Sequence, residues 1–292
     1  MAKRSKPTSL STRAMLVSLN ISAWTGNKRD AEESEQLSIK HGAKNRAARA
    51  HKSLLPDCRE LVELHKYTGT IRTWFYKQTL PWADGMQIIQ VDNYMNFMSE
   101  FRTHRDRWET LAQKFMDVYP DAVRDAGNPH TSSLGTLFKA ADYPDVQSLA
   151  AKFSIDLKYL PVPEAADWRV DLGEEDMGLL RREIEEQVKS STQEAMGVAW
   201  KRLFEVAKHA HEKLSNPGAV FRDTLVHNAA EVCAALRSLN LTGDATLEKM
   251  RREVEVGLCK FNPGTLRKDP LIRADAAAKM AAAMSKMSGY VG

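Results

Sequence analysis

The stretch from Glu174 to Leu214 constrains the fold of this chain more than any other feature. It contains no proline, and its apolar residues recur every three or four positions, which is the spacing of one face of an α-helix. A helix of about 40 residues at ~1.5 Å per residue would be roughly 60 Å long. Because such a helix cannot bury its apolar stripe alone, it needs a long partner helix or a second subunit.

This apolar stripe is also the surface expected to hold copies of the chain together. The spacing is four residues at first and later alternates between three and four, which predicts a stutter in a coiled-coil-like seam. We therefore expect a homo-oligomer whose interface contains Leu180, Ile184, Val188, Met196, Trp200 and Leu203.

Other segments show the same helical periodicity. The segments 57–78 and 92–119 carry apolar residues at alternating spacings of three and four. Glycine and proline are sparse, at 15 and 11 of 292 residues, so long helices are rarely interrupted. Two shorter helices are predicted after the Asn216-Pro217-Gly218 stop, over 219–239 and 244–259. The sequence thus predicts a mainly α-helical fold with long antiparallel coiled-coil-like helices.

A small β element is expected beside these helices. Residues 14–22 alternate between apolar and polar, which predicts a strand. Residues 153–172 are predicted to form a hairpin, with strands at Phe153–Leu160 and Asp167–Leu172 around a proline-containing loop. The strand at 14–22 could pair with this hairpin and make a minimal sheet. A further short strand is predicted at 86–91.

The charge is distributed unevenly along the chain. Residues 1–77 carry 15 Lys+Arg against 7 Asp+Glu, whereas the whole chain has a net charge of only +4. Either an anion-binding end or an ordinary solvated basic face explains this bias. We expect four consecutive regions: a basic disordered tail (1–12), an N-terminal helical region with a basic face (13–120), a mixed linker with the small β region (121–172) and a C-terminal helical region (173–292).

The most basic segment is predicted to be the second half of a helix that begins near Asp30 and ends at Pro56. Several cations within three turns are suited to contact phosphates, and the residues predicted to do so are Lys40, Lys44, Arg46, Arg49 and Lys52. Trp74 and Tyr76 lie beside a lysine and could stack on bases of a single strand, although core packing is the better explanation of such aromatic residues.

No catalytic or metal-binding pattern is apparent. The phosphate-binding motifs GxxxxGK[ST] and GxGxxG are missing, as are GxSxG and HExxH. His209 and His211 are two residues apart, so on a helix they point to different faces and make an awkward metal site. We expect a protein that is not an enzyme and has no cofactor. Three widely spaced cysteines, with neither a secretory signal nor a membrane helix, indicate the cytoplasm.

Several short motifs together resemble an uncharacterised family of helical proteins found in bacteriophages and bacteria. They are residues 24–28 (WTGNK), 80–82 (LPW), 161–163 (PVP), 168–170 (WRV), 221–223 (FRD) and 227–228 (HN), within a resemblance that spans about residues 14–275. The resemblance implies a phage or bacterial cytoplasmic protein, the host cytoplasm being the location if a phage encodes it. Relatives of that kind are often encoded near AAA+ ATPases and von Willebrand A-like proteins. It carries no functional residues over to this chain.

These observations lead to two hypotheses. The first is a non-enzymatic, oligomeric, phage-type protein that binds nucleic acid, with single-stranded DNA as the expected ligand, through its basic N-terminal third. The second is a protein-interaction scaffold, an ATPase adaptor or an inhibitor of a host complex that acts through the surface of its long helix. The expected partners are a second copy of the chain, single-stranded DNA, and an AAA+ ATPase or a host protein, and no membrane is expected.

Overall fold

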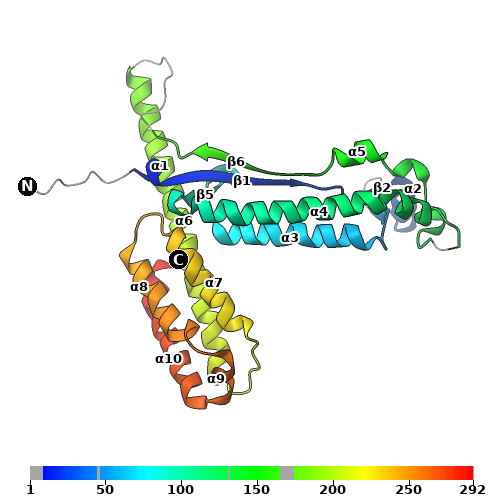
Figure 1. Cartoon of the computed structure of the whole chain (residues 1–292). Coiled ribbons are helices and arrows are strands. Elements are labelled where there is room, and N and C mark those ends of the chain that lie inside the picture. The colour runs from blue at the N-terminus through cyan, green and yellow to red at the C-terminus, as the bar shows by residue number, and fades with distance from the viewer. Residues whose placement is uncertain (1–8, 45–46, 131, 165–173, 292) are drawn as a thin grey trace, which may run out of the picture. The chain divides into compact units, whose positions relative to one another are not determined.

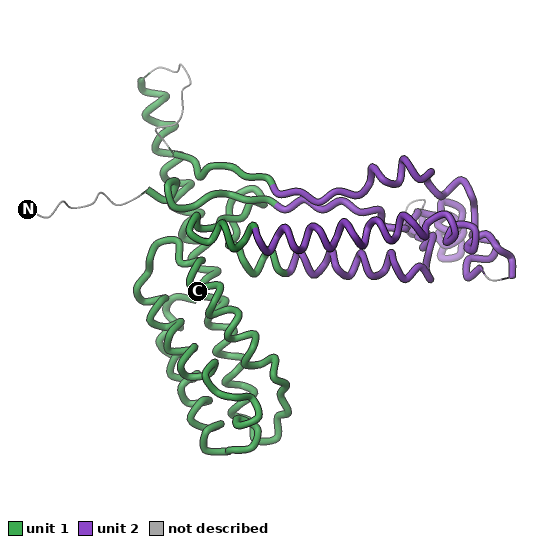
Figure 2. Tube along the Cα trace, viewed as in Figure 1, with its two compact units in different colours: residues 1–18, 74–98, 158–292 green, residues 19–73, 99–157 purple. Residues whose placement is uncertain are grey.

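The computed structural model describes residues 9–44, 47–130, 132–164 and 174–291. It is mainly helical, with two small sheets (Figure 1). The chain divides into two compact units that are interleaved in sequence (Figure 2). Unit 1 comprises residues 1–18, 74–98 and 158–292, and unit 2 comprises residues 19–73 and 99–157.

The units do not follow the four consecutive regions expected from the sequence. The helices α3 (Arg59–Gln78) and α4 (Tyr94–Ala126) each contribute residues to both units. The boundaries expected at residues 120 and 172 therefore do not separate the two units. Most of the expected tail lies outside the described residues, and its end begins the short helix α1 (Leu10–Arg13). None of the helices that the structure describes has the length and apolar character needed to cross a membrane.

The larger sheet has the strand order β4-β5-β1-β6. The strand predicted at 14–22 is confirmed as β1 (Ala14–Ser22), and it is antiparallel to β5 (Gln87–Gln90), with Ala14 opposite Gln90. The first predicted hairpin strand is confirmed as β6 (Ser154–Pro161), a neighbour of β1 in the sheet. The second, at 167–172, lies outside the described residues. The remaining strand is β4 (Leu80–Pro81).

Unit 1 is built around the predicted long helix, which is confirmed as α6 (Glu174–Ser215). Figure 1 shows it running beside three later helices: α7 (Thr224–Leu239), α8 (Ala245–Val254) and α10 (Pro270–Met287). The helix predicted over 244–259 changes to a π-helical turn at Glu255–Cys259, and the short α9 (Pro263–Lys268) precedes α10. A shared apolar core joins α6, α7, α8 and α10.

The apolar stripe of α6 is covered within the chain over much of its length, which corrects part of the expected oligomer interface. Met196, Trp200 and Leu203 are buried in the core of unit 1, where α10 and α7 pack on α6. Trp200 also stacks on Tyr290, with ring centroids 4.2 Å apart. Nearer the start of α6, Ile184 is buried, whereas Leu180 and Val188 are half-exposed. The partner helix that was expected to cover the apolar stripe of α6 is thus α10 of the same chain.

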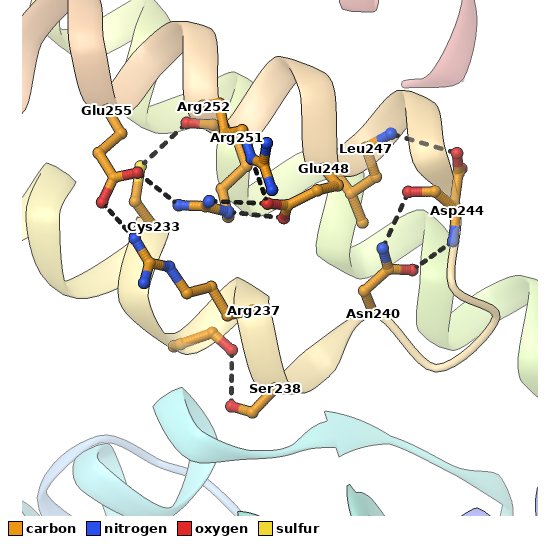
Figure 3. A network of polar contacts seen from close by, with 11 residues as sticks. Cys233, Arg237, Ser238, Asn240, Asp244, Leu247, Glu248, Arg251, Arg252 and Glu255 are labelled. Atoms are coloured by element: carbon orange, nitrogen blue, oxygen red, sulfur yellow. Dashed lines mark hydrogen bonds and ion pairs between the residues drawn. The ribbon is translucent and has the colours of Figure 1, made fainter.

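An arginine-centred network holds α8 to α7 (Figure 3). Arg251 is only 3% exposed and donates two hydrogen bonds of 2.8 Å to the carboxylate of Glu248. A third donor lies 2.8 Å from Glu255, which also accepts from Arg237 on α7 at 2.7 Å. The buried guanidinium is therefore neutralised by two carboxylates. In turn, Arg251 lowers the pKa of Glu248 from 4.5 to about 2.

In unit 2, α3 and α4 pack together around buried aromatic residues. Trp108 donates a 2.8 Å hydrogen bond to Thr68, which places the middle of α4 against α3. Phe115 and Tyr119 form a core with residues that include Leu149 of α5 (Val146–Ala150). The end predicted for the second helix, near 119, is wrong because α4 continues through Pro120 to Ala126. Residues beyond Pro120 still pack on this core, which compensates for the backbone donor that proline lacks.

The basic helix predicted from Asp30 to Pro56 is wrong in its second half. The helix α2 spans only Ala31–Lys40, and the chain returns as the strand β3 (Ala50–Ser53). Gly42 follows the helix with φ of +59°, a left-handed conformation that glycine adopts readily and that ends a helix. The alanine-rich composition of this segment therefore did not decide its structure.

Candidate nucleic-acid interface

A two-stranded ribbon in unit 2 carries the basic segment. The strand β2 (Asn27–Asp30) is antiparallel to β3, with Lys28 opposite Lys52 and Arg29 opposite His51. Residues directly opposite each other in an antiparallel pair share a face of the sheet, and neighbours along a strand lie on opposite faces. The two lysines therefore lie on one face of the ribbon, and Arg29 and His51 lie on the other.

The lysine face of the ribbon carries an ion cluster in which the side chains of Lys52, Asp30 and Asp142 are at most 10% exposed and that of Lys28 is 48% exposed. The ammonium group of Lys52 lies 2.7 Å from the carboxylate of Asp142 and 3.4 Å from that of Asp30, and it donates a 2.7 Å hydrogen bond to the carbonyl of Leu137. Lys28 lies 2.7 Å from the other oxygen of Asp142. This cluster fixes which face of the ribbon points inward.

The ionisation of the cluster follows from its contacts. Hydrogen bonds from Lys28 and then Lys52 lower the pKa of Asp142. The pKa of Asp30 is lowered chiefly by the backbone amide of Glu33, which donates to its carboxylate. Burial disfavours the charged form of Lys52, but the hydrogen bonds and attraction of the two aspartates outweigh it, so its pKa is raised. Asp30, Asp142 and Lys52 are therefore charged at neutral pH.

Helix α2 is tied to the ribbon at both of its strands. Asp30, the last residue of β2, caps the start of α2 by accepting from the amide of Glu33 at 3.2 Å. The hydroxyl of Ser34 donates to the carbonyl of Asp30 and accepts from the amide of Ala50 in β3 at 2.9 Å. The helix is thus held beside the ribbon.

Four cations near this ribbon and the end of α2 face solvent. They make no ion pair with any residue that the structure describes: Arg29, Lys40, Lys44 and Arg49. The acidic residues of α2 lie in its first half, where Glu32 pairs with Lys139 at 3.3 Å. We name these four residues the cationic face. An exposed guanidinium or ammonium without a carboxylate partner is available to a phosphate.

The residues predicted to contact phosphates differ in their exposure to solvent in the structure. Lys40, Lys44 and Arg49 are exposed and belong to the cationic face. Lys52 is 7% exposed and held by two aspartates, so it is removed from the set, because a phosphate would have to break that cluster to reach it. Arg46 lies outside the described residues.

The predicted base-stacking residues fall in the other unit. Trp74 and Tyr76 are on the part of α3 that belongs to unit 1, whereas the cationic face is in unit 2. Trp74 stacks on Phe97, with centroids 5.1 Å apart, as a core residue does. Tyr76 is 54% exposed, and its backbone carbonyl accepts a 2.8 Å hydrogen bond from Arg202. The aromatic residues therefore belong to one unit and the cations to the other.

Sequence reasoning missed two residues of this region. Arg29 joins the cationic face because the ribbon places it opposite His51, and the all-polar sequence of 27–30 has no alternation that would indicate a strand. Asp142 lies far along the chain, and no sequence pattern linked it to Lys52. Among the described residues, no group of His, Cys, Asp or Glu has the arrangement of a metal site. His211 has a structural role, with its ring nitrogen 3.0 Å from the carbonyl of Ala277.

Neither a family model, nor a curated protein, nor a solved structure matches this chain.

Proposed function

We propose that this protein binds nucleic acid through the cationic face of unit 2. The observation that carries the proposal is the division of charge across one ribbon. Lys28 and Lys52 are neutralised by aspartates on the inner face, whereas Arg29 on the outer face has no acidic partner among the described residues. Cations left unpaired on a surface that the fold holds in place are the usual contacts of a phosphate backbone.

Single-stranded DNA is the form proposed first, in keeping with a phage-type protein of the bacterial cytoplasm that acts as an oligomer. The start of α6, where Leu180 and Val188 are half-exposed, is the part of the long-helix stripe still open to a coiled-coil-like contact with a second copy. Self-association would multiply the number of cationic faces on one strand and raise the avidity of binding.

The test is fluorescence anisotropy with a labelled 40-nucleotide single strand and a duplex of the same sequence, over a series of salt concentrations. The variant carries Arg29→Gln, Lys40→Gln, Lys44→Gln and Arg49→Gln. Removing one phosphate-binding cation should reduce the slope of log affinity against log salt by about 0.7 on a single strand and about 0.9 on a duplex. The variant is therefore expected to bind more weakly and with a flatter salt dependence.

The matched control replaces two other exposed cations of unit 2, Lys66→Gln and Lys114→Gln, which also lack an ion pair among the described residues. This control should keep the affinity and the slope of the parent protein. Equal affinity and slope for the parent and the four-residue variant would reject the cationic face as the binding site. An equal loss of binding free energy per removed charge in both variants would indicate binding by net charge alone.

The alternative function is a scaffold, an ATPase adaptor or an inhibitor of a host complex that acts through the long helix. The observation in its favour is the same half-exposed start of α6, where Leu180 is not fully covered by described residues. Substituting Leu179→Asp and Leu180→Asp should then abolish recovery of a partner in a pull-down and leave the salt-dependent oligonucleotide binding unchanged.

A further inference from the structure

A second surface of the molecule, in unit 1, combines a hollow with an excess of positive charge. The helices α8 and α10 lie side by side (Figure 1), and a groove of about 700 Å³ runs between them. The π-helical turn at Glu255–Cys259 forms part of it. Gly257 is at its base, where an added Cβ would lie 2.9 Å from the methyl carbon of Met280 and 3.2 Å from Cβ of Lys279. Glycine at this position therefore allows the two elements to approach closely.

The floor of the groove is apolar and made of small side chains. Ala245 and Val256 come from α8 and the turn that follows it, and Ala282 comes from α10. Val256 is 51% exposed. Ala245, Lys249, Arg252 and Val256 are spaced by four, three and four residues, so they share one face of their helix. Small residues on two neighbouring helices leave room for the backbone of a third helix to lie between them.

The rim of the groove is cationic. Lys249 and Arg252 stand on α8, and Lys279 and Lys286 stand on α10. The lining contains two acids, and each already has a basic partner: Glu248 is held by Arg251 and Arg252, and Glu253 lies 2.8 Å from Lys286. Lys279 lies 2.6 Å from Asp275, so Lys249 is the rim cation without an ion pair among the residues with described positions. An occupant of the groove therefore meets more positive charge than negative.

From this geometry we infer that the α8–α10 groove binds an acidic amphipathic helix of a partner protein. Apolar side chains of the partner would lie on Ala245, Val256 and Ala282, and one of its carboxylates would meet the unpaired Lys249 at the rim. This arrangement is the helix-in-groove mode of recognition, with charge complementarity fixing the orientation. A nucleic acid strand fits less well, because the lining offers no aromatic ring for a base and includes two glutamates.

The test is a selection from a displayed library of random 20-residue peptides on the full chain. The selected peptides should be rich in Asp and Glu and carry apolar residues at three- and four-residue spacing. Their affinity should fall at least about tenfold on Val256→Glu, which places a carboxylate on the floor, and on Lys249→Glu, which reverses a rim charge. Both positions are exposed, so the thermal unfolding of each variant should match that of the parent.

The matched control is Lys260→Glu, which reverses an exposed charge outside the groove lining and should leave peptide affinity unchanged. A selection that recovers no peptide, or only peptides without acidic enrichment, would overturn the inference, as would peptides that bind both groove variants like the parent. If a 40-nucleotide strand displaces the peptides and loses affinity on the same two variants, the groove is a nucleic acid site and the inference is also overturned. The four-residue variant of the cationic face should bind the peptides normally, which separates this inference from the proposed function.

Discussion

Lys52 in unit 2 and Arg251 in unit 1 are both buried cations, but they are neutralised in different ways. Arg251 takes its two glutamates from its own helical stretch, three residues before and four residues after it. Lys52 takes its carboxylates from the end of β2 and from Asp142, and it donates to a carbonyl 85 residues away. The first network is local, and the second joins distant parts of the chain.

The position of the carboxylate partners in the chain determines how each cation contributes to the stability of its unit. The Arg251 network can form wherever its helical turn forms, because residues three and four apart are neighbours on a helix. The Lys52 cluster exists only when the ribbon and the segment around Asp142 are both in place. A buried cation whose partners are distant in the chain should therefore contribute more to the stability of its unit, and four measurements test this difference.

The largest effect is expected for Lys52→Met. Removing the ammonium group leaves Asp30 and Asp142 close together without their shared partner, which should reduce the stability of unit 2 by about 3 kcal/mol. Native-state hydrogen exchange of the β3 amides measures this free energy locally. Arg29→Met alters the same ribbon on its outer face and should change it by less than about 0.5 kcal/mol. Equal effects of the two substitutions would contradict the assignment of the faces.

A smaller loss of stability is expected for Arg251→Met, about 2 kcal/mol measured by hydrogen exchange of α8. Its partners Glu248 and Glu255 have side chains that are 32% and 31% exposed, so water can solvate them once the arginine is gone. A loss as large as that of Lys52→Met would show that local and distant networks contribute equally. Arg251→Lys should recover only part of the stability, because an ammonium cannot make the two parallel contacts to Glu248.

The third-largest effect is expected from acid, which should weaken the Arg251 network. Because the pKa of Glu248 is lowered from 4.5 to about 2, its contribution is fully present above pH 4.5 and disappears as the pH falls toward 2. The expected loss of stability is about 1 kcal/mol between neutral pH and about pH 3.5. The comparison is with Glu248→Gln, whose stability should change less over the same interval. Identical pH profiles for the two proteins would remove Glu248 as the titrating group.

The smallest effect is expected for Arg252→Ala. Arg252 contacts Glu248 at 2.7 Å, but its side chain is 70% exposed, and exposed pairs of this spacing contribute about 0.3–0.5 kcal/mol. Chemical denaturation at low and high salt should show a small loss of stability that salt removes. A loss close to that of Arg251→Met would show that the network, rather than burial of one arginine, sets the stability.

Much of the helical architecture could be predicted from the sequence. The long helix α6 and the helix ending at Gln78 are where periodicity places them, because an apolar residue every three or four positions has few other ways to be buried. The strands β1 and β6 are likewise indicated by alternation. Helical periodicity and strand alternation depend only on residues that are close together in the chain, so a single helix or strand is enough to place these residues on one face.

The candidate site was less predictable. A run rich in alanine and basic residues favours a helix, yet α2 ends at Lys40 and residues Ala50–Ser53 form the strand β3. Its partner strand β2 and the carboxylate of Asp142 are what stabilise the extended form. The same interactions turn Lys52 inward and leave Arg49 exposed, so Lys52 leaves the predicted phosphate-binding set and Arg29 joins it. Propensity alone could not reveal these changes, because the decisive partners are remote.

The sequence by itself determined that this chain is mainly helical, that α6 is long, and that its apolar stripe must be covered. What covers the apolar stripe is known only from the folded structure, in which Met196, Trp200 and Leu203 face helices of the same chain rather than a second copy. The folded structure also decided which cations of the basic segment are neutralised and which face solvent. The physical reason is the same in both cases: periodicity fixes which residues share a face, whereas burial and ion pairing depend on contacts between segments far apart in the chain.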